Sequence, residues 1–271
     1  MNRKYLEQRN HFVVKSNDLI QKTRFRLTTE QQKLILFLIS KIKPTDTEFS
    51  EYEFTISDYF KITGSADGGQ QYKNIEDGLK ALADKSMYIY TDEDTKTLVR
   101  WLSKVHINAK SGKITVRLDE DLKPYLLQIK ERYSQYELIY TFCLKSKYSI
   151  RAYEYFNSRH YNKLKPYSFD ISIEEFKERV GAENYTEYRD LNSRVIKPIV
   201  KEINEYTDKV LIIEPIKEGR TTTALKIMLH SKSTRRRIQL RTVLDEKLGG
   251  NQLTLWDDIE MFEGKEIERN E

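Results

Sequence analysis

Three basic side chains in the second half of the chain are spaced so that they can act together. Arg194, Lys197 and Lys201 are three and four residues apart, which places them on one face of an α-helix. An arginine can donate two hydrogen bonds to guanine, and a lysine can contact guanine or phosphate. Further hydrogen-bonding candidates near this face are Arg189, Ser193 and Asn204. The pattern predicts a helix face suited to reading bases in a DNA groove.

Two other basic clusters follow this helix. A polar turn between two alternating stretches predicts a β-hairpin, and its tip carries Lys217, Arg220 and Thr221, which are placed to contact phosphate or the minor groove. A compact basic run comes after the hairpin and consists of Arg235, Arg236 and Arg237. This run predicts either a phosphate contact or a flexible, solubilising linker.

Catalytic and metal-binding patterns are weak by comparison. The four histidines, His11, His106, His160 and His230, are scattered, and no two have metal-ligand spacing. The segment AKSGKIT around Gly112 lacks the upstream glycine of a phosphate-binding loop and lies between strand-like runs, which favours a hairpin turn. No nucleophilic triad or pair of carboxylates stands out. We therefore expect no enzyme activity, no metal and no cofactor.

The composition is that of a soluble protein. Of the 271 residues, 38% are hydrophobic and 33% charged, and the single cysteine, Cys143, excludes an internal disulfide framework and fits a reducing cytosol. The longest apolar run, from Leu34 to Ile39, is far shorter than the roughly 20 residues of a membrane span. The N-terminus has charge but no apolar stretch typical of a secretory signal. We expect a cytoplasmic protein with no membrane partner.

The net charge of +5 is unevenly distributed along the chain. Residues 186–241 contain 13 Lys/Arg against 7 Asp/Glu, a sum of +6, whereas residues 242–271 contain 3 against 9, a sum of −6. Residues 1–241 therefore carry +11 ahead of an acidic tail. This asymmetry is typical of a nucleic-acid-binding protein with an interaction tail; a solvated charged surface is the alternative.

Two stretches about 116 residues apart are copies of one another. FTISDYFKITG from Phe54 matches FDISIEEFKERVG from Phe169, and the helical segment from Tyr72 matches the one from Tyr188. Each copy predicts a strand, a helix, a turn, a second helix (residues 186–207 in the second copy) and a β-wing. We predict an α+β fold: two tandem winged-helix domains related by internal duplication, plus an acidic C-terminal tail.

Local signals predict where individual helices begin. Thr28 or Thr29, each with a glutamine three residues later, predicts a capping box at the start of an apolar helix. Ser57 and Ser172 are the expected caps of the first helix in each copy. Pro198 predicts that the long helix of the second copy kinks or starts late.

The second helices of the two copies differ on their outward faces. Both point apolar residues inward at helical spacing, but the outward centre of the first copy carries Asp77 and Asp84, flanked by Lys73 and Lys80. Carboxylates at the middle of this face would be repelled by phosphates. We therefore predict that the second copy is the main DNA reader and that Lys73 and Lys80 make auxiliary contacts.

The chain is predicted to divide into three parts. A first winged-helix domain spans residues 1–131, a second spans residues 132–234, and a basic patch with a tail expected to be disordered spans residues 235–271. The tail contains QLTLW, which is close to the QLxLF peptide that docks in the bacterial sliding clamp; its candidate anchors are Gln252, Leu253, Leu255 and Trp256. The alternative is a C-terminal helix that folds back on the body.

Taken together, these stretches resemble the iteron-binding plasmid replication initiators, the Rep proteins with two winged-helix domains. The resemblance covers about residues 11–230 and is carried by LTTEQQKLILFLISKI, KSKYSIRAYEYF, SRVIKPIVKEINEYTD and GRTTTALKIML. It implies a protein that binds direct repeats of double-stranded origin DNA as a monomer, opens adjacent AT-rich DNA and recruits host replication proteins. It also implies a homodimer, formed through the first domain in equilibrium with the monomer, that binds an operator and represses its own promoter.

Two other functions compete with this interpretation. A dimeric transcriptional repressor without an initiator role would show the same DNA-binding signals. A nicking initiator or relaxase would need a metal site beside a tyrosine nucleophile, and the scattered histidines argue against it.

Overall fold

The computed structural model describes residues 11–64, 69–92 and 94–248. The elements up to the central helix are β1 (Phe12–Ser16), α2 (Asn17–Gln21), β2 (Thr23–Arg24), α3 (Thr29–Ile39), β3 (Tyr52–Thr55), α4 (Ile56–Thr63), α5 (Gly69–Asp84), β4 (Ser86–Tyr90), β5 (Lys96–Arg100), β6 (Leu102–Asn108), β7 (Lys113–Leu118), η1 (Glu120–Leu122), α6 (Lys123–Leu126), β8 (Tyr133–Glu137) and α7 (Leu138–Phe142). The remaining elements are α8 (Lys147–Arg159), β9 (Tyr167–Ser172), α9 (Ile173–Val180), α10 (Tyr188–Leu191), η2 (Asn192–Ile196), α11 (Lys197–Tyr206), β10 (Lys209–Glu218), β11 (Thr221–Ser231) and α12 (Thr234–Lys247).

Two units with the same strand order account for half of these elements. The first consists of β3, α4, α5 and the β6–β7 hairpin, and the second of β9, α9, the helices from α10 to α11, and the β10–β11 hairpin. In each unit the leading strand joins the second strand of the hairpin, which gives the orders β3-β7-β6 and β10-β11-β9. Phe54 pairs with Ile114, and Phe169 pairs with Ile227. The predicted pair of winged-helix domains is confirmed.

The first helix of each unit has the same length and the same kind of end. α4 and α9 both have eight residues and stop at a glycine, Gly64 or Gly181. Their φ angles are +70° and +77°, in the left-handed region that glycine adopts without a steric penalty. The matching glycines therefore set the turn between the two helices in both units.

The helix caps agree with the sequence in two cases and differ in a third. Thr28 forms a capping box with Gln31 at the start of α3, and Ser172 accepts a hydrogen bond at the start of α9, as predicted. The expectation for Ser57 is wrong. Thr55 is the N-cap of α4, so Ser57 lies inside the helix.

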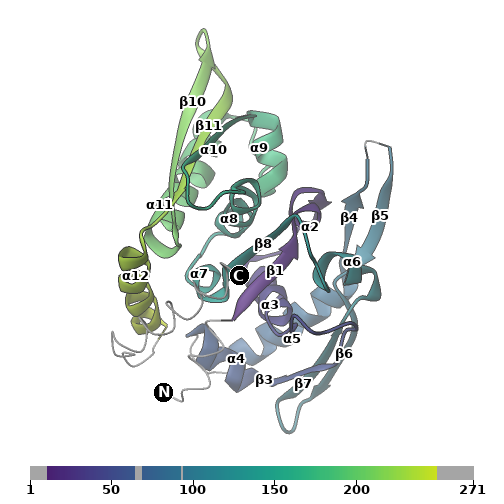
Figure 1. Ribbon diagram of the computed structural model, residues 1–271. Coiled ribbons are helices and arrows are strands. Elements are labelled where there is room, and N and C mark those ends of the chain that lie inside the picture. Colours follow the sequence, from purple (N-terminus) through teal and green to yellow (C-terminus); the bar gives the residue numbers. More distant parts are fainter. Residues whose placement is uncertain (1–10, 65–68, 93, 249–271) are drawn as a thin grey trace.

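An extra hairpin distinguishes the first unit from the second. Between α5 and β6 the chain forms β4 and β5, which pair with each other and, through β4, with β2. In the second unit the chain passes from α11 directly into β10. Figure 1 shows β4 and β5 at the right-hand edge and the β10–β11 hairpin projecting at the top. The two turns predicted in the first unit are confirmed.

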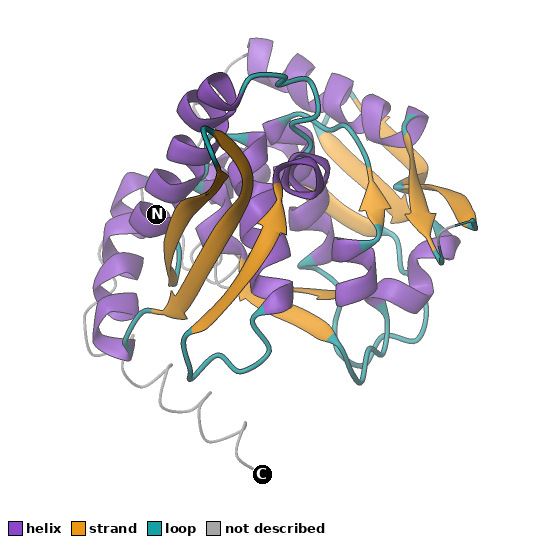
Figure 2. Cartoon of the chain, turned by 90° about the horizontal axis from the view of Figure 1, so that it is seen from above, coloured by secondary structure: helices purple, strands orange, loops and turns teal. Residues whose placement is uncertain are grey.

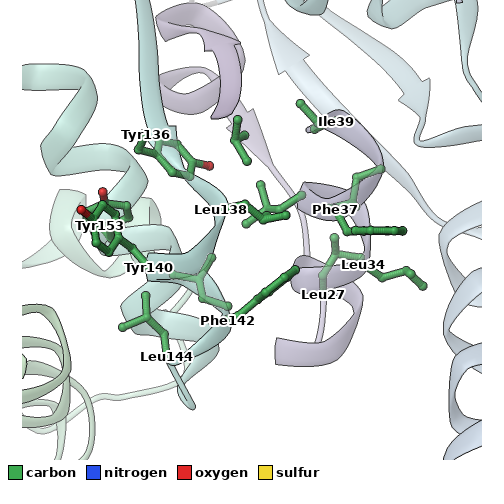
Figure 3. Close-up of a cluster of buried hydrophobic side chains, with 14 of the residues drawn as sticks. Leu27, Leu34, Phe37, Ile39, Tyr136, Leu138, Tyr140, Phe142, Leu144 and Tyr153 are labelled. Atoms are coloured by element: carbon green, nitrogen blue, oxygen red, sulfur yellow. The ribbon is translucent and has the colours of Figure 1, made fainter. Parts of the chain in front are cut away.

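The two units share a hydrophobic core centred on α8. Residues 149–158 of this helix are all buried, because it packs against α9 and α11 on one side and α2, α3 and β8 on the other. Figure 3 shows part of the core, where Leu34 and Phe37 of α3 lie opposite Leu138 and Phe142 of α7. Seen from above, strands lie on both sides of a central group of helices (Figure 2).

Strand pairing crosses the predicted domain boundary after residue 131. β1 pairs with β8 along its whole length, in antiparallel orientation. Behind this ladder, Lys15 Nζ lies 2.7 Å from Glu154 Oε1 of α8, and both side chains are buried. The Tyr136 hydroxyl of β8 donates to the same carboxylate. β8 therefore contacts both β1 and α8. The location of the domain boundary after residue 131 stays a prediction.

The structure corrects the expectation for residues 235–248. These residues do not begin a disordered tail: α12 packs on the rest of the protein, with Arg241, Leu244 and Asp245 buried. Apolar periodicity could not identify this helix, because charged residues lie on its buried side.

Contacts of α12 reach both winged-helix units. A methyl group added to Gly64 would lie 2.6 Å from Leu248 Cα, so the end of α12 packs directly on the first helix-turn-helix. Lys247 Nζ lies 3.6 Å from the centre of the Tyr206 ring, at the end of α11. The helix therefore bridges the turn of the first unit and the long helix of the second.

Candidate nucleic-acid interface

The predicted base-reading residues lie on one continuous helix, formed by α10, η2 and α11, which we call the reader helix. Residues 192–196 are π-helical, and Pro198 follows almost at once. Proline has no N–H to donate to the carbonyl of Arg194, and its ring crowds that carbonyl. A wider π turn just before the proline relieves this conflict. The interruption predicted at Pro198 is therefore a local change of winding within one helix.

The inner face of the reader helix is completely buried. Leu191, Val195, Ile199 and Ile203 are all 0% exposed. These residues are four apart. In a regular α-helix, four residues turn about 40° more than one full turn, so the side chains would drift around the helix. The π segment has more residues per turn, which keeps these side chains in line toward the core and fixes which face points outward.

The outer face carries the predicted cations. Arg194, Lys197 and Lys201 are exposed on the side opposite the buried row, and so are Arg189 and Ser193. The Ser193 hydroxyl donates a 3.3 Å hydrogen bond to the carbonyl of Asp190. A helical wheel of the sequence places six residues on this outward face: Asp190, Ser193, Arg194, Lys197, Lys201 and Asn204. The first five are exposed, and Asn204 is half-buried.

Asn204 is not available to read a base, and this prediction is corrected. Its Nδ2 donates to the carbonyl of Leu211 at 2.8 Å, and its Oδ1 accepts from the Leu211 N–H at 2.7 Å. Both polar groups of the amide are therefore used to join the reader helix to the first strand of the wing.

Polar contacts hold the C-terminal half of the reader helix. Glu202 accepts hydrogen bonds from the N–H groups of Lys145 and Ser146, at 3.1 and 3.2 Å, just before α8. Lys232 Nζ donates to the carbonyl of Thr207 at 2.7 Å, where a cation suits the negative end of the helix. Burial lowers the pKa of Lys232. These contacts fix the reader helix relative to α8 and the sheet.

A groove of about 600 Å³ separates the reader helix from the wing. Its floor is apolar and includes Ile196, Val200 and Ile213, while Lys197 and Lys217 lie on its opposite sides. Such a groove can hold the sugar–phosphate backbone, with the apolar floor against the sugars and the lysines beside the phosphates.

The tip of the β10–β11 hairpin is polar and exposed. Lys217, Arg220 and Thr221 are all exposed there, and Gly219 makes the turn with φ +63°. The two strands have 10 and 11 residues, against six in β9, so the hairpin extends beyond the sheet. The tip lies at the far end of the hairpin in Figure 1.

Sequence reasoning missed Lys145, which lies beside this surface. It lines a second groove, of about 330 Å³, together with Lys197 and Lys201. The lysine belongs to the loop before α8 and comes close to the reader helix only through the fold. A loop position has no periodicity that could have identified it.

The equivalent helix of the first unit, α5, presents mixed charge. Lys73 and Lys80 are exposed, but so are Asp77 and Asp84. Lys85 is engaged inside the unit, where its Nζ donates to the carbonyl of Arg26 at 3.2 Å. The predicted contrast between the two outward faces is therefore present in the structure.

The basic run after the wing occupies the first turn of α12. Arg235 and Arg236 are exposed, and Arg237 is partly buried, with its Nη2 donating to Thr234 Oγ1 at 3.2 Å. Cations at this end of a helix oppose the helix dipole. The linker alternative for these three arginines is wrong, because they are helical.

Other kinds of site have less support. Among the described residues, no three His, Cys, Asp or Glu side chains come together in a group that could hold a metal ion. No helix in the same part of the chain is both long and apolar enough to cross a membrane. The predicted clamp-binding residues Gln252, Leu253, Leu255 and Trp256 lie outside the described residues.

A reader helix, an apolar groove and a polar wing, on a chain with two winged-helix units, define a DNA-binding protein. Two family models show which class of DNA-binding protein this is. The model of the first winged-helix domain of initiator replication proteins matches residues 12–157, and the model of the second winged-helix domain of initiator Rep proteins matches residues 172–229. The chain therefore belongs to the replication initiator family, as the resemblance predicted.

Two relatives illustrate this membership. A curated replication initiation protein from Escherichia coli is 30% identical over 221 residues, which is 79% of this chain and 67% of that protein. The fold is similar to that of the Pi initiator protein, crystallised in complex with iteron DNA, with a TM-score of 0.70 and 15% identity over 83% of this chain and 99% of that one.

Proposed function

We propose that this replication initiator acts on a plasmid origin by binding its direct repeats, or iterons, as double-stranded DNA. The observation that carries the proposal is the outer face of the reader helix, where Arg194, Lys197 and Lys201 are exposed opposite a completely buried row. The likeness to the Pi initiator, which was crystallised with iteron DNA, supports this choice of ligand.

The mechanism begins with electrostatic attraction. The basic surface displaces counterions from the DNA backbone, and the reader helix then enters the major groove, where its arginine and lysines contact base edges. Lys217, Arg220 and Thr221 hold the neighbouring backbone or minor groove. Distortion of the duplex by several bound copies lowers the cost of opening the adjacent AT-rich DNA. Host replication proteins are then recruited in the cytoplasm.

Arg194 and Lys197 provide the direct test. Fluorescence anisotropy on a duplex with the repeats from the origin compares Arg194→Ala and Lys197→Ala with the wild type. Each variant is expected to lose about 1–3 kcal/mol of binding free energy and to discriminate less at the base it contacts. Wild-type affinity in both variants would remove the assignment.

Lys226 supplies a matched control. It is exposed on β11 between the buried residues Leu225 and Ile227, so it lies on the side of the sheet that faces away from the helices. Lys226→Ala removes the same charge without touching the reader helix. We expect it to bind the repeats as the wild type does.

We also propose that the protein acts without catalysis. In this case, supercoiled origin DNA incubated with the protein and Mg²⁺ stays supercoiled. Nicked circles that depend on the protein and the metal would instead support a nicking initiator or relaxase.

A second candidate function is repression of its own promoter by a homodimer. It is favoured by the outward carboxylates Asp77 and Asp84, which suit a role in pairing and positioning better than in binding phosphate. Tandem repeats of about two helical turns beside an AT-rich stretch in the DNA next to the gene would support initiation. An isolated operator with no repeats would support a plain repressor.

The sliding clamp is a proposed host partner. Leu255→Ala combined with Trp256→Ala removes both candidate anchors of the QLTLW peptide and is expected to abolish clamp capture in a pull-down while leaving DNA binding unchanged. Undiminished capture by the double variant would rule out this motif as the contact.

A further inference from the structure

A pocket of about 250 Å³ lies between the two winged-helix units, away from the outer face of the reader helix. Phe25 and Arg26, just before α3, and Gln32 of α3, a helix that packs on α5 of the first unit, form one side. Lys147 and Arg151 of α8 form another. The turn between α9 and α10 closes the pocket with Gly181, Glu183 and Asn184. A ligand in this pocket would therefore contact the helix-turn-helix turn of the second unit and a helix that packs on the first unit.

The Arg151 guanidinium is an unusual group to find in the wall of this pocket. The residue is only 8% exposed, and its nearest carboxylates, Glu183 and Glu154, act on it through their charge, without a hydrogen bond to the guanidinium. Nη1 donates to the carbonyl of Phe25 at 2.9 Å, and the guanidinium lies 4.5 Å from the centre of the Phe25 ring. A carbonyl and an aromatic ring stabilise a buried guanidinium less than an anion in direct contact with it would, because burying a charge without such a partner is costly.

The position of Arg151 is fixed by its neighbours. A methyl group added to Gly181 would lie 3.0 Å from Arg151 Nη1, so the backbone of the turn packs directly against the guanidinium. Burial lowers the pKa of Arg151 to about 10, and the group therefore remains charged at neutral pH. The cation is held at the wall of the pocket by the fold.

The rest of the lining is also suited to an anion. Arg26 and Lys147 are exposed at the pocket, and Glu183 is the single carboxylate among its lining residues. With Arg151, the lining therefore has three cations and one anion, a formal charge of +2. Lys147 lies in the first turn of the 13-residue helix α8, whose N-terminus adds a partial positive charge.

A line of lysines connects this pocket to the reader helix. Lys145 lines the groove beside Lys197 and Lys201, and Lys147, two residues farther along, lines the pocket. The DNA backbone passes the beginning of the recognition helix in helix-turn-helix complexes. A phosphate of bound DNA can follow this basic line toward the space between the units.

We propose that the pocket is a phosphate-binding site, with the Arg151 guanidinium at its wall and Arg26 and Lys147 at its opening. A phosphodiester of the DNA backbone and a free phosphate-bearing molecule share this chemistry. The DNA source rests on the proposed function, whereas binding of free phosphate does not. A phosphate held here would link the two units while the reader helix is in the groove.

The first experiment titrates inorganic phosphate into the full chain without DNA, at constant ionic strength in chloride. Trp101 is the reporter, because its ring lies 5.2 Å, edge to face, from Phe25 at the pocket. Trp256→Phe leaves it as the sole tryptophan of the two in the sequence. We expect a saturable change in fluorescence, weakened about tenfold or more by Arg26→Ala with Lys147→Ala.

The second experiment scans methylphosphonate linkages along a repeat-bearing duplex, neutralising one phosphate at a time. Wild-type protein is expected to lose affinity at a linkage to which the Arg26→Ala/Lys147→Ala variant is insensitive. Lys130→Ala with Lys165→Ala, two exposed lysines outside the pocket, removes the same charge and should behave as the wild type in both experiments. These variants avoid the buried Arg151, whose replacement can disturb folding.

The outcomes separate the two sources. A response to free phosphate alone supports a soluble ligand, a methylphosphonate effect alone supports the DNA backbone, and both together support a site that either source can fill. Absence of both effects overturns the proposal. If wild-type protein does not bind the repeats at all, the proposed function fails, and the phosphate titration alone decides about the pocket.

Discussion

The two winged-helix units have the same inner residues and different outer ones. Ile75 and Leu79 of α5 are buried like their counterparts Leu191 and Val195 in the reader helix. On the outside, Asp77 of the first unit stands where the second has a serine. Buried positions determine that both segments fold as winged helices, whereas exposed positions determine what each surface binds.

The helix-turn-helix turns differ in what packs on them. Gly64 and Gly181 have nearly the same backbone conformation. The first is covered by the backbone of Leu248 at the end of α12, and the second by the side chain of Arg151. The first turn therefore anchors a C-terminal helix, and the second forms part of the pocket between the units.

Alanine at these two glycines should have unequal effects on stability. Gly64→Ala places a methyl group 2.6 Å from Leu248 Cα, where backbone cannot easily yield, and also strains a left-handed residue. We expect a loss of about 3 kcal/mol or more in the free energy of unfolding. Gly181→Ala meets only the side chain of Arg151, with Nη1 as the one close atom at 3.0 Å, and should lose about 1–2 kcal/mol. Urea unfolding followed by circular dichroism measures both.

Gly219 is the control for this pair. It has φ +63°, and a methyl group there would meet nothing within 4 Å. Gly219→Ala therefore isolates the backbone strain, at about 1–2 kcal/mol. Equal losses at Gly64 and Gly219 would show that α12 does not press on the first turn in solution.

The sequence was sufficient to predict the duplicated fold. The match between the stretches from Phe54 and Phe169 is visible because buried residues recur at helical and strand spacing in both copies. The same periodicity predicted the outward side of the reader helix. These features depend on residues close together in the chain.

Features that depend on how separate elements pack against one another could not be predicted. Asn204 is suited to reading adenine in a wheel diagram, but the fold brings it to the backbone of Leu211. Arg151 is charged and gives no sign of burial, yet it contacts Phe25, 126 residues earlier. α12 was missed because Arg241 and Asp245 lie on its buried side.

The cations of the two second helices should contribute unequally to DNA binding. Lys197→Ala is expected to cost about 1–3 kcal/mol, and Lys80→Ala, beside the carboxylates of α5, less than about 1 kcal/mol. Affinities measured over a range of salt concentrations should show a smaller salt slope for Lys197→Ala. Equal costs for the two variants would mean that both units read the DNA alike.

Asn204→Ala should affect stability and leave base preference unchanged. The substitution removes two hydrogen bonds between the reader helix and β10, which should cost about 1–2 kcal/mol in the free energy of unfolding. Urea denaturation and binding to repeats with single base changes provide the two measurements. A changed base preference with unchanged stability would restore the role that the sequence alone predicted.

The smallest effect is expected from making the first unit more like the second. Asp77→Ser installs the residue that the second unit has at the matching position and removes a carboxylate from the outward face of α5. Less repulsion from phosphate should raise the affinity for any duplex by less than about 1 kcal/mol, because exposed charges are screened by water and salt. The gain should disappear at high salt and be the same for repeat and scrambled DNA. A gain confined to the repeats would instead show that α5 reads sequence, and the division of labour between the two units would have to be abandoned.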